Sequence, residues 1–143
     1  MNREKARIMS ENNKLPLGEA ALNLLFATYR WHAEVDRDYK FELTHDEFRV
    51  LTKGNCFYCG AEPSQKFGHQ LNGQYIYNGV DRYDNSKGYS TENCVSCCGS
   101  CNKAKGKRSA DDFINSSLAI AEKQKERAEE LLRLSLPKLV ASV

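Results

Sequence analysis

Residues 78–105 read NGVDRYDNSKGYSTENCVSCCGSCNKAK, and this stretch decides how the chain folds. Residues 74–83, which overlap its start, are rich in Tyr, Ile and Val, and DNSKG is typical of a turn. A second short run, over 92–97, contains two cysteines. We therefore expect a strand over 74–83 and a return strand over 92–97. A helix should begin near Cys98, so the pattern predicts a hairpin followed directly by a helix.

Two cysteine pairs have the spacing of zinc ligands. Cys56-x-x-Cys59 precedes the quoted stretch and Cys98-x-x-Cys101 lies inside it. A C-x-x-C turn lets two thiolates reach one tetrahedral ion, and Gly60 suits a knuckle-type turn after the first pair. Four protein sulfurs leave no open coordination position, so we predict a structural Zn²⁺ that serves folding.

A second choice of ligands exists, because Cys94-x-x-Cys97 has the same spacing. We prefer Cys98 and Cys101, since Gly99 suits a tight turn and Cys101 leads into the predicted helix. Cys94 would then be a strand residue and Cys97 a buried thiol, the common state of a free cysteine.

The ordered motif C-x-x-C, then N-G-V-D-R-x-D-N-x-x-G-Y-x-x-x-N-C-V-x-x-C-C-x-x-C-N-x-x-K, resembles the HNH endonucleases. The likeness covers roughly residues 38–115, and this version resembles the small phage and intron-encoded homing-type proteins and restriction enzymes of that superfamily. It implies an α+β fold: a ββα-metal (HNH) core with a zinc-knuckle site of four cysteines, flanked by N-terminal and C-terminal helices.

The resemblance also assigns roles to individual residues. It implies that Asp81 and Asn102 hold a catalytic Mg²⁺ or Mn²⁺, while Asn93 braces the hairpin loop. One carboxylate and one amide suit a hard cation and leave positions for water and a phosphate oxygen. Where the family usually has Asp-His, this chain has Asp81-Arg82. A guanidinium cannot act as a general base, so Arg82 is expected to grip the scissile phosphate.

The general base is therefore left open by the sequence. His45, at the start of the second predicted helix, is one candidate for a catalytic role. The others are His32, His69, Tyr39, Tyr77, Tyr83 and Tyr89, or water activated by the metal alone.

Basic residues concentrate around the cysteine-rich part. Residues 53–108 hold eight Lys/Arg and four Asp/Glu, whereas both flanks are slightly acidic. Such a surplus favours contacts with phosphates, and we predict double-stranded DNA as the partner. The expected DNA-binding residues are Arg82, Lys87, Lys103, Lys105, Lys107 and Arg108.

The flanking segments are predicted mainly from apolar periodicity and capping signals. A helix is expected over 18–37, with a core-facing stripe. Thr44 and Glu47 form a capping box that opens a second helix ending at Gly54. Residues 61–73 are expected to form a loop. The core-facing stripe consists of Leu22, Leu25, Phe26, Tyr29 and Ala33.

We expect one compact domain with extensions: an arm and helix over 1–37, a nuclease core over 38–115 and a helical extension over 116–143. Residues 1–16 are polar and predict a mobile arm. Ser109 with Asp112 should cap the last helix, which runs to about Leu134 and could support a homodimer.

The sequence disfavours a membrane-spanning protein and a secreted, disulfide-bonded one. No apolar run is long enough for a membrane span, and no secretion signal is evident, so we expect cytoplasmic localisation, in a host cell if the chain is phage-encoded. Six cysteines then indicate metal ligands or buried thiols rather than disulfides.

The leading hypothesis is a metal-dependent DNA endonuclease, homing-type or restriction-like, that nicks or cuts duplex DNA. The alternative is a catalytically inactive, zinc-stabilised module that binds nucleic acid. The presence of both Asp81 and Asn102 favours the enzyme, because a binding module needs neither.

Overall fold

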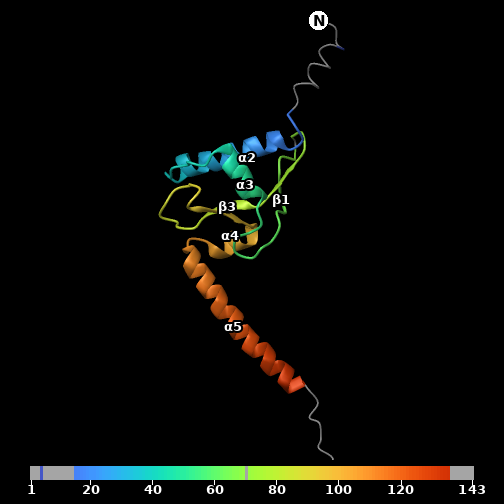
Figure 1. Cartoon of the computed structure of the whole chain (residues 1–143), viewed down its shortest axis with the longest axis vertical. Helices are drawn as coiled ribbons and strands as arrows, with labels where there is room; N and C mark the ends of the chain where they lie inside the picture. Colours follow the sequence, from blue (N-terminus) through green and yellow to red (C-terminus); the bar gives the residue numbers. More distant parts are fainter. Residues whose placement is uncertain (1–3, 5–14, 70, 136–143) are drawn as a thin grey trace, which may run out of the picture.

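The computed structural model describes residues 4, 15–69 and 71–135. Most of the predicted arm, and the last eight residues, lie outside the described part. What is described is a small mixed core from which one long helix projects (Figure 1).

Two helices cover the N-terminal side of this core. Helix α2 (Glu19–Trp31) continues into a π-helical turn, η1 (His32–Asp36), and α3 (His45–Lys53) follows after a short link. The predicted apolar stripe is confirmed, because Leu22, Leu25 and Ala33 are buried and the two aromatic members pack against them. The predicted capping box is also confirmed: the Thr44 amide donates to the Glu47 carboxylate at 2.8 Å.

The strands form two separate antiparallel pairs. Strand β1 (Gln65–Phe67) pairs with β2 (Tyr75–Tyr77), and β3 (Gly79–Arg82) pairs with β4 (Cys94–Cys97). Two predictions are therefore wrong in part, since the expected loop contains β1 and the single expected strand is divided between two sheets.

Buried Asn78 explains the division. Its backbone amide donates to Thr52 O at 2.9 Å. Its side-chain amide donates to the carbonyls of Gly54 and Ala61, both at 3.0 Å. Because these bonds tie the chain to the end of α3 and to the first cysteine loop, the strand is interrupted at this residue.

The β3–β4 hairpin leads directly into α4 (Gly99–Lys105), which confirms the predicted hairpin-and-helix unit. Side chains alternate across a strand, so Val80 and Arg82 face one side of the hairpin and Asp81 faces the other. Val80 accordingly joins the main apolar core, whereas Asp81 faces α4 and the first cysteine turn.

Helix α5 (Ala110–Ser135) begins at the predicted cap, where the Asp112 amide donates to Ser109 Oγ at 3.1 Å. It leaves the core after its first turns, and its leucines, including Leu118 and Leu131, are exposed (Figure 1). Within residues 4, 15–69 and 71–135, no helix combines the length and the apolar character needed to cross a bilayer.

Candidate metal centres and catalytic cavity

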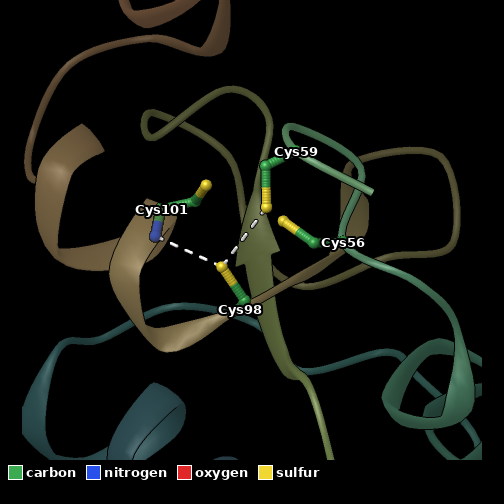
Figure 2. A group of neighbouring side chains, drawn as sticks. All are labelled: Cys56, Cys59, Cys98 and Cys101. Carbon is green, nitrogen blue, oxygen red and sulfur yellow. Dashed lines mark hydrogen bonds between the residues drawn. The ribbon is translucent and has the colours of Figure 1, made fainter. Parts of the chain in front are cut away.

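The four predicted zinc ligands lie together. The sulfurs of Cys56, Cys59, Cys98 and Cys101 are all within 4.8 Å of one another, with Cys59 Sγ and Cys98 Sγ 3.7 Å apart (Figure 2). Zn–S bonds of about 2.3 Å in a tetrahedron require sulfurs about 3.8 Å apart. The donor set and its spacing therefore fit a metal ion such as zinc.

The backbone of the first cysteine turn, residues 56–60, helps to place the four sulfurs. Gly60 has a φ of 76°, which favours glycine, and its amide closes the first turn by donating to Cys56 O at 2.8 Å. The Phe57 amide donates to Ser96 O at 2.8 Å, so the turn is anchored to β4. Burial opposes ionisation of Cys56, but backbone hydrogen bonds from Cys98, Cys59 and Tyr58 outweigh it and lower the pKa of this thiol to about 6.

Cys94 and Cys97, the alternative pair, are not part of the sulfur cluster. Both are buried on β4, and burial raises the pKa of Cys94 to about 12. The Cys97 thiol donates to Cys98 O at 3.4 Å. These contacts favour two protonated, structural thiols, which agrees with the preferred ligand set.

Asp81 lies on the face of the hairpin that meets the cysteine corner. Its carboxylate is only 8% exposed and accepts a hydrogen bond from Tyr58 Oη at 2.7 Å. Burial, and then the hydrogen bond and charge of Asp81, raise the pKa of Tyr58 well above its ordinary value. The phenol is consequently the resting form of Tyr58.

Lys105 is the second partner of Asp81, and here a prediction is wrong. Lys105 was expected on the DNA-facing surface, but it is 1% exposed and its ammonium lies 3.2 Å from each Asp81 oxygen. Lys105 is the last residue of α4, and its ammonium also donates to Arg82 O at 3.0 Å, so the side chain points toward β3. It cannot contact DNA from this position.

A cavity of about 960 Å³ brings the other predicted site residues together. Asp81, Arg82 and Asn102 all line it, from β3 and α4, and its opposite wall comes from α2, η1 and the residues that follow. The proposed metal ligands Asp81 and Asn102 thus border one concave surface. A carboxylate offers about four lone-pair sites, and Tyr58 and Lys105 make three contacts to Asp81, so it retains capacity for one further ligand.

Arg82 faces the other side of β3 but reaches the same cavity. Its guanidinium carbon lies 3.7 Å from the centroid of the Tyr39 ring, and Nη1 donates to Asn85 O and Lys87 O at 3.1 and 2.8 Å. In the described part of the chain, Nε and Nη2 have no hydrogen-bond acceptor, which leaves two donor atoms for an anion.

Asn93 braces the loop that joins the two strands, as the resemblance implies. Its carbonyl oxygen accepts from the Asp84 amide at 2.9 Å, and its amide donates to Asp84 O and Gly88 O at 3.0 and 2.9 Å. These bonds fix the loop beside Arg82.

The candidate general bases differ in whether they line the cavity. His45 does not line the cavity; its ring packs against Phe26 at 5.2 Å, on the apolar side of the molecule. His69 and Tyr83 are also outside the cavity lining. The candidates that do line it are His32, Tyr39, Tyr77 and Tyr89.

The remaining basic residues differ in exposure and neighbours. Lys103, Lys107 and Arg108 are exposed near the end of α4, and Lys107 lines the cavity. Lys87 is exposed in the hairpin loop, where it pairs with Asp84 at 3.4 Å. The guanidinium of Arg108 donates to the carbonyls of Ala104 and Lys105 and lies over the Phe113 ring, so it is already partly engaged within the protein.

Sequence reasoning missed Tyr58 and the inward direction of Lys105. A signal existed for both: Tyr58 lies between two predicted zinc ligands, and Lys105 has helical spacing to Asn102. Neither signal shows which way a side chain points, which depends on how the first cysteine turn packs against β3.

Comparison with known proteins found limited likeness. No family model matches the chain. Uncharacterized protein R423 of Acanthamoeba polyphaga mimivirus is 35% identical over 95 residues, which are 66% of this chain and 16% of that protein. The chain therefore corresponds to only a small part of this relative. Among solved structures, the rare-cutting HNH restriction endonuclease PacI is 19% identical with a TM-score of 0.49, over 73% of this chain and 80% of that one.

Proposed function

We propose that this protein is a metal-dependent endonuclease of the HNH type that hydrolyses phosphodiester bonds in double-stranded DNA. The observation that carries the proposal is the shared cavity, which Asp81 and Arg82 of β3 and Asn102 of α4 all line. The same three residues occupy the key positions of the sequence motif.

Asp81 and Asn102 supply the oxygen ligands that Mg²⁺ and Mn²⁺ prefer. A divalent cation bound there would stabilise the charge that develops on the scissile phosphate and the leaving oxygen. Among the described residues, two donor atoms of Arg82 have no acceptor, and this side chain is suited to hold a phosphate oxygen in the cavity that it lines.

Of the candidate bases, His32, Tyr39, Tyr77 and Tyr89 line the same cavity, and we assign the proton transfer from the attacking water to this group. Tyr58 does not line the cavity, and its phenol is the resting form. Its hydrogen bond of 2.7 Å instead fixes the direction of the Asp81 carboxylate.

Exposed Lys87, Lys103, Lys107 and Arg108 would hold the duplex through its phosphates. Such contacts position DNA without reading its sequence and weaken as salt rises. We place specificity, and the proposed homodimer contact, on α5 and the N-terminal part, because the apolar side chains of α5 are exposed.

A plasmid-nicking assay with Mg²⁺ or Mn²⁺ tests the proposal. Asp81→Ala and Asn102→Ala should each lower the cleavage rate at least about 100-fold, a loss typical of removing a group that stabilises transition-state charge. Asp46→Ala and Asn23→Ala change the same residue types on α3 and α2, away from the cavity lining, and should cleave normally. Equal cleavage by all five proteins contradicts the site.

One observation favours the alternative of an inactive nucleic-acid-binding module. The Lys105 ammonium already contacts both oxygens of Asp81, so the carboxylate has a cation within the protein itself. If the zinc-loaded protein binds duplex DNA but cuts none with Mg²⁺, Mn²⁺ or Co²⁺, that module is the correct description.

A further inference from the structure

Lys105 is the one charged residue in the described part of the chain whose side chain is wholly buried. An ammonium has three N–H donors, and this one has three acceptors: Asp81, Arg82 O at 3.0 Å and Asn85 Oδ1 at 3.2 Å. All three acceptors belong to β3 or the loop after it. The charge is therefore fully satisfied by the strand that carries the proposed metal ligand and by its loop.

A buried ion pair is a weak source of stability. Replacing such a pair by apolar side chains of similar volume is often neutral or stabilising, because two charges lose their hydration. The fold alone does not require a cation at this point of the hairpin. Its contact with Asp81, the anionic group of the cavity, indicates a role in the site.

We propose that Lys105 is a positioning residue that fixes the Asp81 carboxylate and lowers its affinity for a divalent cation. This inference rests on the proposed function. The ammonium contacts both carboxylate oxygens while Tyr58 donates to one, so the orientation of the Asp81 carboxylate is fixed by two side chains. The positive charge of Lys105 also repels a second cation on the same carboxylate and keeps that cation exchangeable.

Two neutral variants of the full-length, zinc-loaded protein test this, with Mn²⁺ as the probe. Lys105→Met keeps the length of the side chain, and Lys105→Gln keeps a hydrogen-bond donor. Both should bind Mn²⁺ on the order of tenfold more tightly in titrations followed by electron paramagnetic resonance, because the repulsion is removed. Their kcat should nevertheless fall at least about tenfold, because the carboxylate is no longer fixed.

The opposite signs of these two effects separate positioning from a merely structural role. A structural defect would weaken Mn²⁺ binding and cleavage together. Lys66→Met, at an exposed lysine on β1 outside the cavity lining, is the matched control and should change neither the Mn²⁺ affinity nor kcat. In an Asp81→Asn background, Lys105→Met should have no effect on Mn²⁺ binding, since the two residues act through one contact.

Unchanged Mn²⁺ affinity in both neutral variants overturns the inference, as does weaker binding. Failure of both variants to fold with one zinc per chain assigns Lys105 to stability and also overturns it. The proposed function fails separately: in that case the wild-type protein itself neither binds Mn²⁺ through Asp81 nor cuts DNA.

Discussion

The two faces of the β3–β4 hairpin are held in different ways. On one face Val80 and Cys94 join a core of aromatic and aliphatic side chains from α2 and α3. On the other, Cys97 joins a much smaller cluster that consists mainly of the proposed zinc ligands and Tyr58. Asp81 belongs to this second face and Arg82 to the first, so the proposed site joins the two.

This difference shows what each kind of stabilisation can position. The aromatic face sets the place of α2, α3 and the cavity wall through ring contacts such as Phe26–Phe48 at 5.3 Å. The cysteine face has too little apolar surface to hold a turn and a two-turn helix. We therefore infer that a metal ion held by the four cysteines keeps Tyr58 and α4 against Asp81.

The largest expected effect comes from removing the metal. Structural zinc contributes about 10–16 kcal/mol of apparent binding free energy in small zinc domains at neutral pH. Cys98→Ser should therefore lose zinc, disorder the first cysteine turn and α4, and abolish cleavage. Zinc content by elemental analysis and amide hydrogen exchange of residues 56–60 and 99–105 measure this.

The matched control is Cys94→Ala, which changes a buried cysteine on the aromatic face. It should retain one zinc per chain and lose only part of the unfolding free energy. Stoichiometric zinc in Cys98→Ser, or loss of zinc in Cys94→Ala, would mean that Cys94 and Cys97 are the zinc ligands. The zinc ligands would then not be confined to the cysteine face of the hairpin.

The second effect is on the aromatic face alone. Phe48 is fully buried and meets Phe26 and Tyr29 edge to face. Phe48→Ala should lower the free energy of unfolding by about 3–5 kcal/mol, because it removes a large side chain and leaves a cavity. Urea unfolding followed by circular dichroism measures the loss, and the folded Phe48→Ala variant should still hold one zinc per chain. Proportional loss of zinc would show that the faces are not independent.

Much of this arrangement could be predicted because its signals are local. The capping box of α3 and the two C-x-x-C pairs depend on residues three apart, and the apolar stripe of α2 depends on helical period. Each of these signals is complete within one element. The hairpin and α4 followed from the turn residues and the motif together.

What could not be predicted depends on contacts between distant segments. Strands β1 and β2 are only three residues long, and their pairing, rather than their composition, defines them. The break at Asn78 depends on carbonyls of Gly54 and Ala61. Lys105 was placed on the surface because most lysines are exposed, and its burial becomes favourable through three acceptors, at Asp81, Arg82 and Asn85, that lie far from it in the sequence.

The smallest expected effect comes from removing one buried hydrogen bond on the aromatic face. Thr52 Oγ1 and Tyr75 Oη are buried and 2.9 Å apart, so each hydroxyl has a partner inside the core. Tyr75→Phe should cost about 1 kcal/mol of unfolding free energy, the usual net value of one such hydrogen bond. Thr52 Oγ1 keeps its bond to Phe48 O at 2.9 Å and is not left unsatisfied.

Tyr77→Phe is the control: within the described residues the Tyr77 hydroxyl makes no hydrogen bond, so the free energy of unfolding should be unchanged. Equal losses in both variants would mean that ring packing, and not the buried hydroxyl pair, determines the stability of this face.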